Sequence, residues 1–264
     1  TQGQTTYSEW LASPSAAAGI QCQGCHMPAA TTAGSIAAGI GVAPVRPGKQ
    51  RHDHSFPGVY SNVLGRPVEV RLDFKMAAPH VIVTSEVENL TGGHAWPTGV
   101  DVRNAFVHVE AFLNGHPLGF ESGDTLPAWT SDDVPGRDPG DYGGLPGRGY
   151  AKLLSGRING EGERVAPVPF IDADQVVAVT AIPAGATDAG RYTFRLPETA
   201  RSGDELSLRA TVIYRRAWRA FAVTKGWTEL EMDEPWEREV AEVTVSHALS
   251  AQDLKQIFID DFER

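Results

Sequence analysis

The sequence has little of what would bind a chain to nucleic acid or carry it through a membrane. Its 264 residues include 23 Lys and Arg against 33 Asp and Glu, a formal net charge of −10. Binding to nucleic acid or to an anionic membrane surface requires a concentrated positive patch, so neither partner is expected. No stretch approaches the ~18 consecutive apolar residues of a membrane-spanning helix, so no transmembrane segment is predicted.

Cysteine is also scarce, and its placement is informative. The only two, Cys22 and Cys25, lie in the pentapeptide CQGCH, which ends at His26. A Cys-x-x-Cys-His run is typical of covalent c-type haem attachment. Two thiols one helical turn apart reach the two vinyl groups of one porphyrin, and the adjacent histidine becomes the proximal iron ligand. The sequence therefore predicts one covalent haem c.

Three other uses of these cysteines fit the sequence less well. A redox dithiol expects a strand before it and a long helix after it, whereas MPAATTAGSIAAGIGVAP follows here. A zinc site needs four ligands, and completing it with His52 and His54 gives a His-x-His spacing that departs from the usual one. A disulfide across two intervening residues is strained and closes almost no loop. Haem attachment is the preferred interpretation.

The second axial ligand is predicted from two histidines in stiff turns. His54 opens HSFPG, and His94 lies in GGHAWPTGV. In each motif an aromatic residue follows the histidine by two positions and proline comes next, which can hold an imidazole at a fixed angle. A buried turn histidine bonded to backbone is the alternative in both cases. His54 is the first candidate, because it lies on the same loop-rich segment as CQGCH, and His94 is the second. Bis-His ligation is typical of an electron-relaying haem.

Three aromatic residues are candidates for packing against the porphyrin. Trp10 lies in YSEWLAS, which is predicted to form one or two helical turns that stop at Pro14. A small core contact is an equal alternative for this residue. Phe56 and Trp96 belong to the two histidine motifs, where their rings can seal an edge of the macrocycle from water.

From Pro67 onward the sequence becomes strand-like. In PVEVRLDF, apolar residues alternate with charged ones, which is the period of a half-buried strand. Several short strands separated by turn signals predict a mainly β fold, an antiparallel Ig-like β-sandwich. The predicted strands cover residues 67–74, 80–88, 106–113, 175–182, 190–196, 205–214 and 239–245, with an Asn-Gly turn after the third.

These patterns divide the chain into three parts. Residues 1–66 form the predicted haem c-binding segment of loops and short helices, and 67–249 form the β-sandwich domain. Residues 250–264 are predicted to be a C-terminal helix with Ser250 as its N-cap. The Gly- and Pro-rich stretch 121–174 interrupts the strand pattern, and we interpret it as a long insertion running over the surface, with a cover over the haem as the alternative.

Three segments together resemble the bacterial multihaem c-type cytochromes. They are YSEWLASP…GIQCQGCHMPAA, RHDHSFPGV and NLTGGHAWPTGVDVRN. In that family C-x-x-C-H-M-P is followed by H-x-F-x-G, and G-H-x-F-P-T-G opens a β-rich domain. The resemblance implies an exported electron-transfer protein whose haem residues are Cys22, Cys25, His26, His54 and His94. The family carries several haem motifs and this chain has one, so one distal-type histidine is left without an assigned iron.

The leading functional prediction is an electron carrier, or the haem subunit of a larger redox complex. It requires a redox partner protein, such as another cytochrome or an oxidoreductase subunit, and leaves the oligomeric state open. Because covalent haem attachment implies export, a periplasmic or extracellular location is expected, and the chain is interpreted as processed or as an excised fragment. Alternatives are a peroxidase-like enzyme with an open sixth position, an assembly module of an extracellular multihaem complex, and a mononuclear metal site at His52, His54 and His94.

Overall fold

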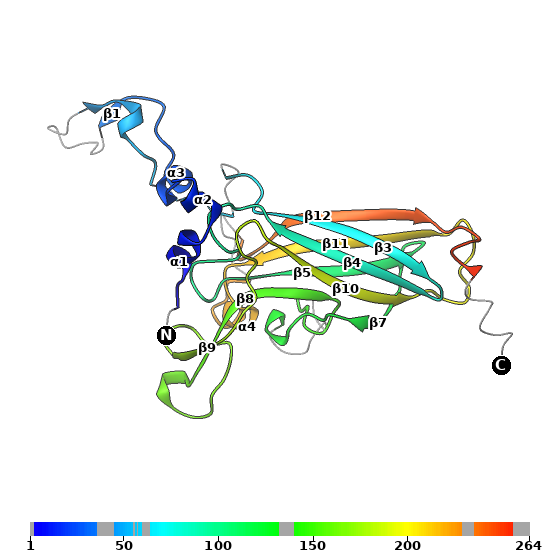
Figure 1. The fold of residues 1–264 in the computed structure, drawn as a ribbon. Coiled ribbons are helices and arrows are strands. Elements are labelled where there is room, and N and C mark those ends of the chain that lie inside the picture. The colour runs from blue at the N-terminus through cyan, green and yellow to red at the C-terminus, as the bar shows by residue number, and fades with distance from the viewer. Residues whose placement is uncertain are drawn as a thin grey trace.

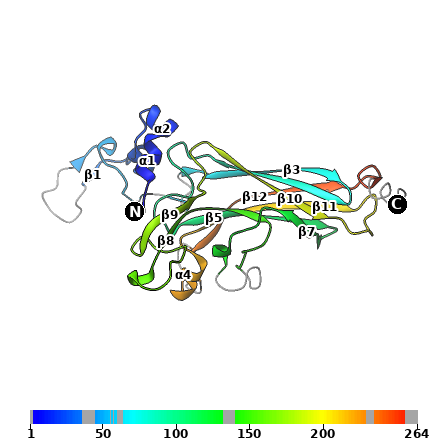
Figure 2. The same cartoon turned by 60° about the horizontal axis from the view of Figure 1, so that its bottom comes forward.

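Two antiparallel sheets packed face to face make up most of the molecule. The computed structural model describes residues 3–35, 45–54, 56, 58–59, 64–131, 140–228 and 235–255. One sheet has the strand order β3-β4-β10-β7, and the other has the order β12-β11-β5-β8-β9 with β6 beside β5. The sheets form two layers, and the N-terminal segment is attached at one end (Figure 1, Figure 2). The predicted mainly β fold, with antiparallel sheets and short helices, is confirmed.

The strands predicted from alternation are present. The predicted Asn-Gly turn follows the third of them, and there Asn114 has φ 50° and Gly115 has φ 79°. The sandwich strands are β3 (Val68–Ala77), β4 (His80–Asn89), β5 (Asn104–Leu113), β6 (His116–Pro117), β7 (Gly119–Gly123), β8 (Gly147–Gly156), β9 (Ala173–Val179), β10 (Thr187–Arg195), β11 (Glu205–Arg215) and β12 (Glu237–Ala248). The remaining elements of this part are η3 (Ala128–Thr130), η4 (Ile158–Gly160) and α4 (Arg219–Thr224).

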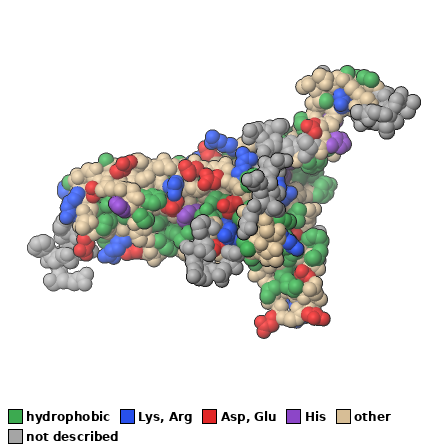
Figure 3. All heavy atoms as spheres, turned by 180° about the vertical axis from the view of Figure 1, so that it is seen from behind, with side chains coloured by type: hydrophobic (Ala, Val, Ile, Leu, Met, Phe, Trp, Pro, Cys, Tyr) green, Lys and Arg blue, Asp and Glu red, His purple; other side chains and the backbone are tan. Residues whose placement is uncertain are grey.

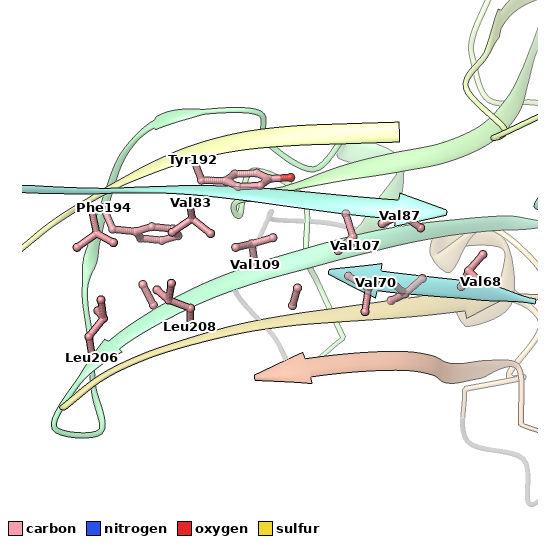
Figure 4. Close-up of a cluster of buried hydrophobic side chains, with 14 of the residues drawn as sticks. Val68, Val70, Val83, Val87, Val107, Val109, Tyr192, Phe194, Leu206 and Leu208 are labelled. Atoms are coloured by element: carbon pink, nitrogen blue, oxygen red, sulfur yellow. The ribbon is translucent and has the colours of Figure 1, made fainter. Parts of the chain in front are cut away.

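The main core lies between the two sheets. Side chains from alternate positions of each strand point inward, because successive residues of a strand face opposite sides of its sheet. Val68 and Val83 of one sheet are fully buried, as are Val107 and Leu208 of the other. Figure 4 shows these side chains meeting between the layers. Burial of this apolar surface is the main force that holds the sandwich together.

The interruption in the strand pattern contains a strand that the sequence analysis missed. Residues 147–156 form β8, which lies between β5 and β9 in the six-stranded sheet. The interpretation of 121–174 as a surface insertion is therefore wrong for this part. A Cβ at Gly147 would lie 2.2 Å from the Val107 carbonyl oxygen, and one at Gly149 would lie 2.6 Å from the Trp129 ring. These close approaches require glycine, and the glycines hide the alternation expected of a strand.

A buried arginine ties two loops to the end of the six-stranded sheet. Arg215 has no exposed side-chain surface, and its Nε donates to Glu237 Oε2 at 2.7 Å. Its Nη1 and Nη2 donate to the carbonyl oxygens of Thr130 and Gly140, each at 2.7 Å. The guanidinium carbon lies 4.8 Å from the centre of the Phe106 ring. The guanidinium thus supplies donors to one carboxylate and to a carbonyl group of each loop.

The described residues of the N-terminal segment form short helices and short strands. Helix α1 confirms the predicted helical turns, but Pro14 begins a second helix and Ser13 Oγ accepts from Ala16 N at 3.3 Å. Proline is favoured at the first position of a helix, because its missing N–H has no partner there. The elements are α1 (Thr6–Leu11), α2 (Pro14–Ala17), α3 (Cys22–His26), β1 (Gly34–Ser35), β2 (Val45–Arg46) and η1 (Gly48–Gln50).

The start of the predicted C-terminal helix forms turns. Ser250 and Asp253 exchange hydrogen bonds, with Asp253 N donating to Ser250 Oγ at 3.2 Å and Ser250 N donating to Asp253 Oδ2 at 2.8 Å. This reciprocal pattern is that of a capping box, as expected for an N-cap serine. Leu254 is buried against the core. The rest of the predicted helix, 256–264, lies outside the described residues.

Candidate haem-binding site

The pentapeptide CQGCH forms the one-turn helix α3. Cys22 and Cys25 are both exposed and free. Residues three apart on a helix lie on the same side, so both thiols are presented together. His26 ends the helix and is half-buried. The Cys-x-x-Cys-His spacing, which predicts haem attachment, therefore presents two accessible thiols on the same helical turn as an imidazole.

A short antiparallel pairing fixes the chain directly after His26. Ala30 N donates to the Arg51 carbonyl at 2.8 Å, and Asp53 N donates to the Pro28 carbonyl at 3.0 Å. His52 Nδ1 lies 2.6 Å from the Met27 carbonyl oxygen. Because a carbonyl only accepts, His52 Nδ1 is the donor. His52 was considered only as a metal ligand from the sequence, and its structural part in holding the CQGCH turn was missed.

Helices α1 and α2 join the N-terminal segment to the loop between β4 and β5. Ser15 N donates to the Gly92 carbonyl at 3.0 Å. The Thr98 hydroxyl lies 2.9 Å from the hydroxyl of Thr6 and 2.7 Å from Glu9 Oε2. The loop held in this way, residues 90–103, contains His94. Segments far apart in the sequence are thus brought together at one end of the sandwich (Figure 1).

One buried asparagine shapes the part of that loop that precedes His94. Asn89 is fully buried, and its Nδ2 lies within 3.1 Å of the carbonyl oxygens of His94, Ile182 and Pro183. Its Oδ1 accepts from Thr91 N at 2.8 Å. The side chain replaces backbone partners that an irregular loop lacks. Sequence reasoning missed this residue, because an asparagine at a strand end is ordinary.

We expect Asn89→Ala to lower the free energy of unfolding by about 2–3 kcal/mol, because three carbonyl groups each lose one of their donors and Thr91 N loses its acceptor. Denaturant unfolding of the full chain measures this change. Thr91→Val is the matched control: it removes one hydroxyl from the same loop and should cost about 1 kcal/mol. Equal losses for the two variants would show that Asn89 does not organise the loop.

His94 lies beside His26 in a defined orientation. The two ring centres are 6.1 Å apart, and the ring planes differ by 17°. His94 Nδ1 lies 2.8 Å from the Ala95 carbonyl oxygen, so Nδ1 carries the proton and Nε2 keeps its lone pair. A hydrogen bond from the other ring nitrogen to a carbonyl group commonly orients a histidine that binds a metal.

The ring separation fits a metal between the two histidines. With metal–nitrogen bonds of about 2 Å, two imidazoles on opposite sides of one ion have ring centres roughly 6 Å apart. Cys22 and Cys25 lie on the same helical turn as His26, and two apolar side chains next to that turn are exposed: Ile20 by 45% and Phe56 by 57%. These residues therefore fit a haem c: two thiols, two nitrogen donors and apolar side chains for a porphyrin to cover.

The other predicted site residues occupy different surroundings. The Phe56 ring is stacked on His26, with centres 5.5 Å apart and planes 5° apart. His54 is exposed, and Ser55 and Pro57 of its motif lie outside the described residues. Trp10 is half-buried, and its Nε1 donates to the Ile20 carbonyl at 2.9 Å, which ties α1 to the residues that precede α3.

Trp96 belongs to the sandwich core. It is 3% exposed, it pairs with Ile182 through two backbone hydrogen bonds of 2.9 and 2.8 Å, and its ring lies 6.3 Å from that of Tyr214. Its indole N–H is buried without a hydrogen-bond partner among the described residues. The structure gives Trp96 a packing role beneath the His94 loop, while a contact with haem stays a prediction.

The described residues contain no group of three or more His, Cys, Asp and Glu side chains arranged to hold a metal ion. A mononuclear site at His52, His54 and His94 is therefore not formed there. The side chain of His108, in β5, is 13% exposed and packs against Tyr142. Burial lowers the pKa of His108, an effect that Glu110 opposes.

Among the described residues, the helices are too short and too polar to span a membrane.

Comparison with known proteins gives one informative likeness, which concerns the fold. No family model matches the chain, and no curated protein is significantly similar to it. The structure is similar to the crystal structure of a penta-heme cytochrome c552 from Thermochromatium tepidum, with a TM-score of 0.57 and 21% sequence identity. The match covers 92% of this chain and 51% of that chain, so this chain spans about half the length of its neighbour. The chain therefore has a multihaem cytochrome c-like fold, as the resemblance implied.

Proposed function

We propose that this protein transfers electrons through a single haem c. Cys22 and Cys25 would hold the porphyrin by thioether bonds, and His26 and His94 would bind its iron. The observation that carries it is the parallel pair of imidazoles, 6.1 Å apart beside two accessible thiols. His94 replaces His54 as the preferred distal ligand, because its ring lies beside His26 and its Nδ1 is already bonded to backbone.

Each residue of the site has a distinct part in this proposal. Asn89 and Thr98 hold the loop that carries His94, and His52 holds the turn that carries His26. Fixed imidazoles limit rearrangement around the iron when its charge changes. The exposed Phe56 side chain, which stacks on His26, would exclude water from the part of the porphyrin that it covered.

Two histidine ligands to the iron would favour electron transfer over catalysis. When bound, haem c would supply an iron that accepts and donates one electron. If His26 and His94 both held the iron, no position would remain on it for a small-molecule substrate. The function requires a redox partner protein, and covalent attachment of haem implies an exported protein. The net charge of −10 favours a partner with a basic docking surface.

The test is the spin state of the iron in holoprotein matured in a host equipped for cytochrome biogenesis. We expect a low-spin spectrum for the natural chain and a change to high spin in His94→Ala, because that variant lacks one strong-field axial nitrogen. Visible absorption and electron paramagnetic resonance measure the change. His54→Ala is the matched control and should stay low-spin.

A low-spin His94→Ala protein together with a high-spin His54→Ala protein would assign the distal position to His54 and overturn the role of His94. A resting high-spin natural chain that binds cyanide or carbon monoxide would contradict electron transfer itself and favour the peroxidase-like alternative. Unchanged circular dichroism in both variants confirms that the fold is retained.

A further inference from the structure

The charge of the chain is divided unevenly between the N-terminal segment and the rest of the chain. Residues 1–66 contain four Lys and Arg against two Asp and Glu, a surplus of two positive charges. Residues 67–264 contain the other 19 Lys and Arg against 31 Asp and Glu, a surplus of twelve negative charges. Figure 3 shows Asp and Glu side chains spread over the visible face of the sandwich. The net charge of −10 therefore does not describe the segment that carries CQGCH.

Three basic residues of the segment lie close together in VRPGKQR, residues 45–51. Backbone pairing places this stretch beside the chain that follows His26, where the Arg51 carbonyl oxygen accepts a hydrogen bond of 2.8 Å and strand β2 pairs with β1. Arg46 is exposed and Arg51 is partly exposed. Asp53, two residues later, is exposed and offsets one of these charges. The strand beside the CQGCH turn is thus basic on balance.

The loop that carries His94 also exposes a positive side chain. Arg103 of this loop is exposed, whereas Asp101 is only 3% exposed. Glu9, on the helix that contacts the loop, is half-buried, and its two oxygens accept from threonine hydroxyls at 2.7 Å each. We call three arginines the basic rim, because they belong to the two segments that carry the proposed iron ligands: Arg46, Arg51 and Arg103.

We propose that the redox partner docks on the basic rim and presents an acidic face to it. This proposal rests on the proposed function, because the partner has to reach the haem. Electron-transfer complexes have small interfaces, and charge steers their partners into place. At about 0.1 M ionic strength the Debye length is about 10 Å, so a partner beside CQGCH responds to nearby charges more than to the distant acidic strands. The net charge of −10 alone would favour a basic partner, and the basic rim reverses that preference where electrons leave.

The first test compares two small oxidants of opposite charge, each of which takes one electron from the reduced holoprotein. Ferricyanide is an anion and tris(phenanthroline)cobalt(III) is a cation, and stopped-flow absorption measures both rates. At about 0.1 M ionic strength, Arg51→Glu with Arg103→Glu should lower the ferricyanide-to-cobalt rate ratio roughly tenfold or more, because two charge reversals remove four positive units. Arg46→Glu, in the exposed strand β2, should lower the ratio by a smaller factor.

Arg195→Glu is the matched control for these charge reversals. Arg195 is also an exposed arginine, at 55%, but it pairs with His80 at the far end of β4 from the loop that carries His94. The ten residues of β4 separate the two ends by roughly 30 Å, about three Debye lengths. Its variant should keep the natural rate ratio. An equal fall in the control and the double variant would show that the whole-chain charge steers the oxidants, and would overturn the proposal.

The thiols of the full chain without haem give a second measure of the same local charge. Dithiobis(nitrobenzoate) carries two negative charges and cystamine carries two positive ones. With either reagent a protein thiolate attacks a disulfide sulfur, a mixed disulfide forms and one reagent thiolate leaves. Arg51→Glu should lower the ratio of the two initial rates, anionic to cationic, roughly fivefold, and the ratio cancels any shared change in thiolate content. Arg195→Glu should leave it unchanged.

The outcomes separate this inference from the proposed function. A natural chain that takes up no haem contradicts the proposed function, as its spectrum shows directly. A redox-active haem whose rate ratio is unchanged by Arg51→Glu with Arg103→Glu overturns the acidic partner alone, even if the reduction potential shifts, because the arginines then serve the haem and not a partner. An unchanged thiol ratio in Arg51→Glu overturns it as well. The visible spectrum of each holoprotein variant confirms that the haem site is retained.

Discussion

Replacing both cysteines, Cys22→Ala with Cys25→Ala, is expected to abolish covalently bound haem in protein matured in a cytochrome-producing host. Both thiols lie on one exposed helical turn, and no other cysteine exists in the chain to replace them. Haem staining after denaturing electrophoresis and the pyridine haemochrome spectrum measure the loss. We expect the natural chain to hold one haem per polypeptide and the double variant to hold none.

The matched control for this variant is Gln23→Ala, which alters an exposed residue of the same turn and leaves both sulfurs in place. It should retain one haem. Covalent haem in the double variant, or a colourless natural chain with two thiols that react with alkylating reagents, would contradict the haem proposal as a whole. Because the cysteines contribute nothing to the sandwich core, the β-sheet signal in circular dichroism should persist in every variant.

Arg215→Ala is expected to lower the free energy of unfolding by about 3–5 kcal/mol, the usual result of removing one partner from a buried ion pair. Glu237 and the carbonyl groups of Thr130 and Gly140 would lose their donors, and the packed Phe106 ring would border a cavity. Burial lowers the pKa of Arg215, and the neighbouring carboxylate of Glu237 opposes this effect. Denaturant unfolding of the full chain measures the effect.

A second arginine of the same strand provides the control. Arg209 also forms an ion pair, with Glu110, but its side chain is 44% exposed, so Arg209→Ala should cost about 0–1 kcal/mol. If Arg215→Ala does not fold, Arg215→Lys keeps the charge without the planar fork and should give an intermediate loss. Similar losses for Arg215→Ala and Arg209→Ala would show that the buried network is not a stabilising one.

The fold was predictable wherever a strand has one face buried in the core and the other exposed to solvent. Val68 and Val70 alternate with charged residues, and the structure buries them as that pattern requires. Strand β8 escaped prediction because its alternation is broken by glycines whose neighbours leave no space for a Cβ. Tertiary contacts with Val107 and Trp129 created that requirement, and they cannot be inferred from residues 147–156 alone.

The candidate site was predictable in part for a related reason. Cys22, Cys25 and His26 form a local motif, so their spacing already defines their geometry. The choice between His54 and His94 depends on how α1 and α2 dock against the loop after β4. The hydrogen bond between Ser15 and Gly92 joins residues that are far apart in the sequence, and no pattern in the sequence predicts it. Without such contacts, His54 was preferred because it is nearer to CQGCH along the chain.

His26 lies on the N-terminal segment and His94 on a loop of the sandwich, and α1 and α2 join these two parts. In the proposed haem protein, the iron would therefore fasten the tethering segment to the sandwich and close a loop of roughly 70 residues. Because this bond would form only in the folded chain, its free energy would add to the stability of the fold. The melting temperature of the holoprotein should then depend on whether the iron is bound to His94. Chemistry that breaks the bond to His94 would then lower the melting temperature of the sandwich.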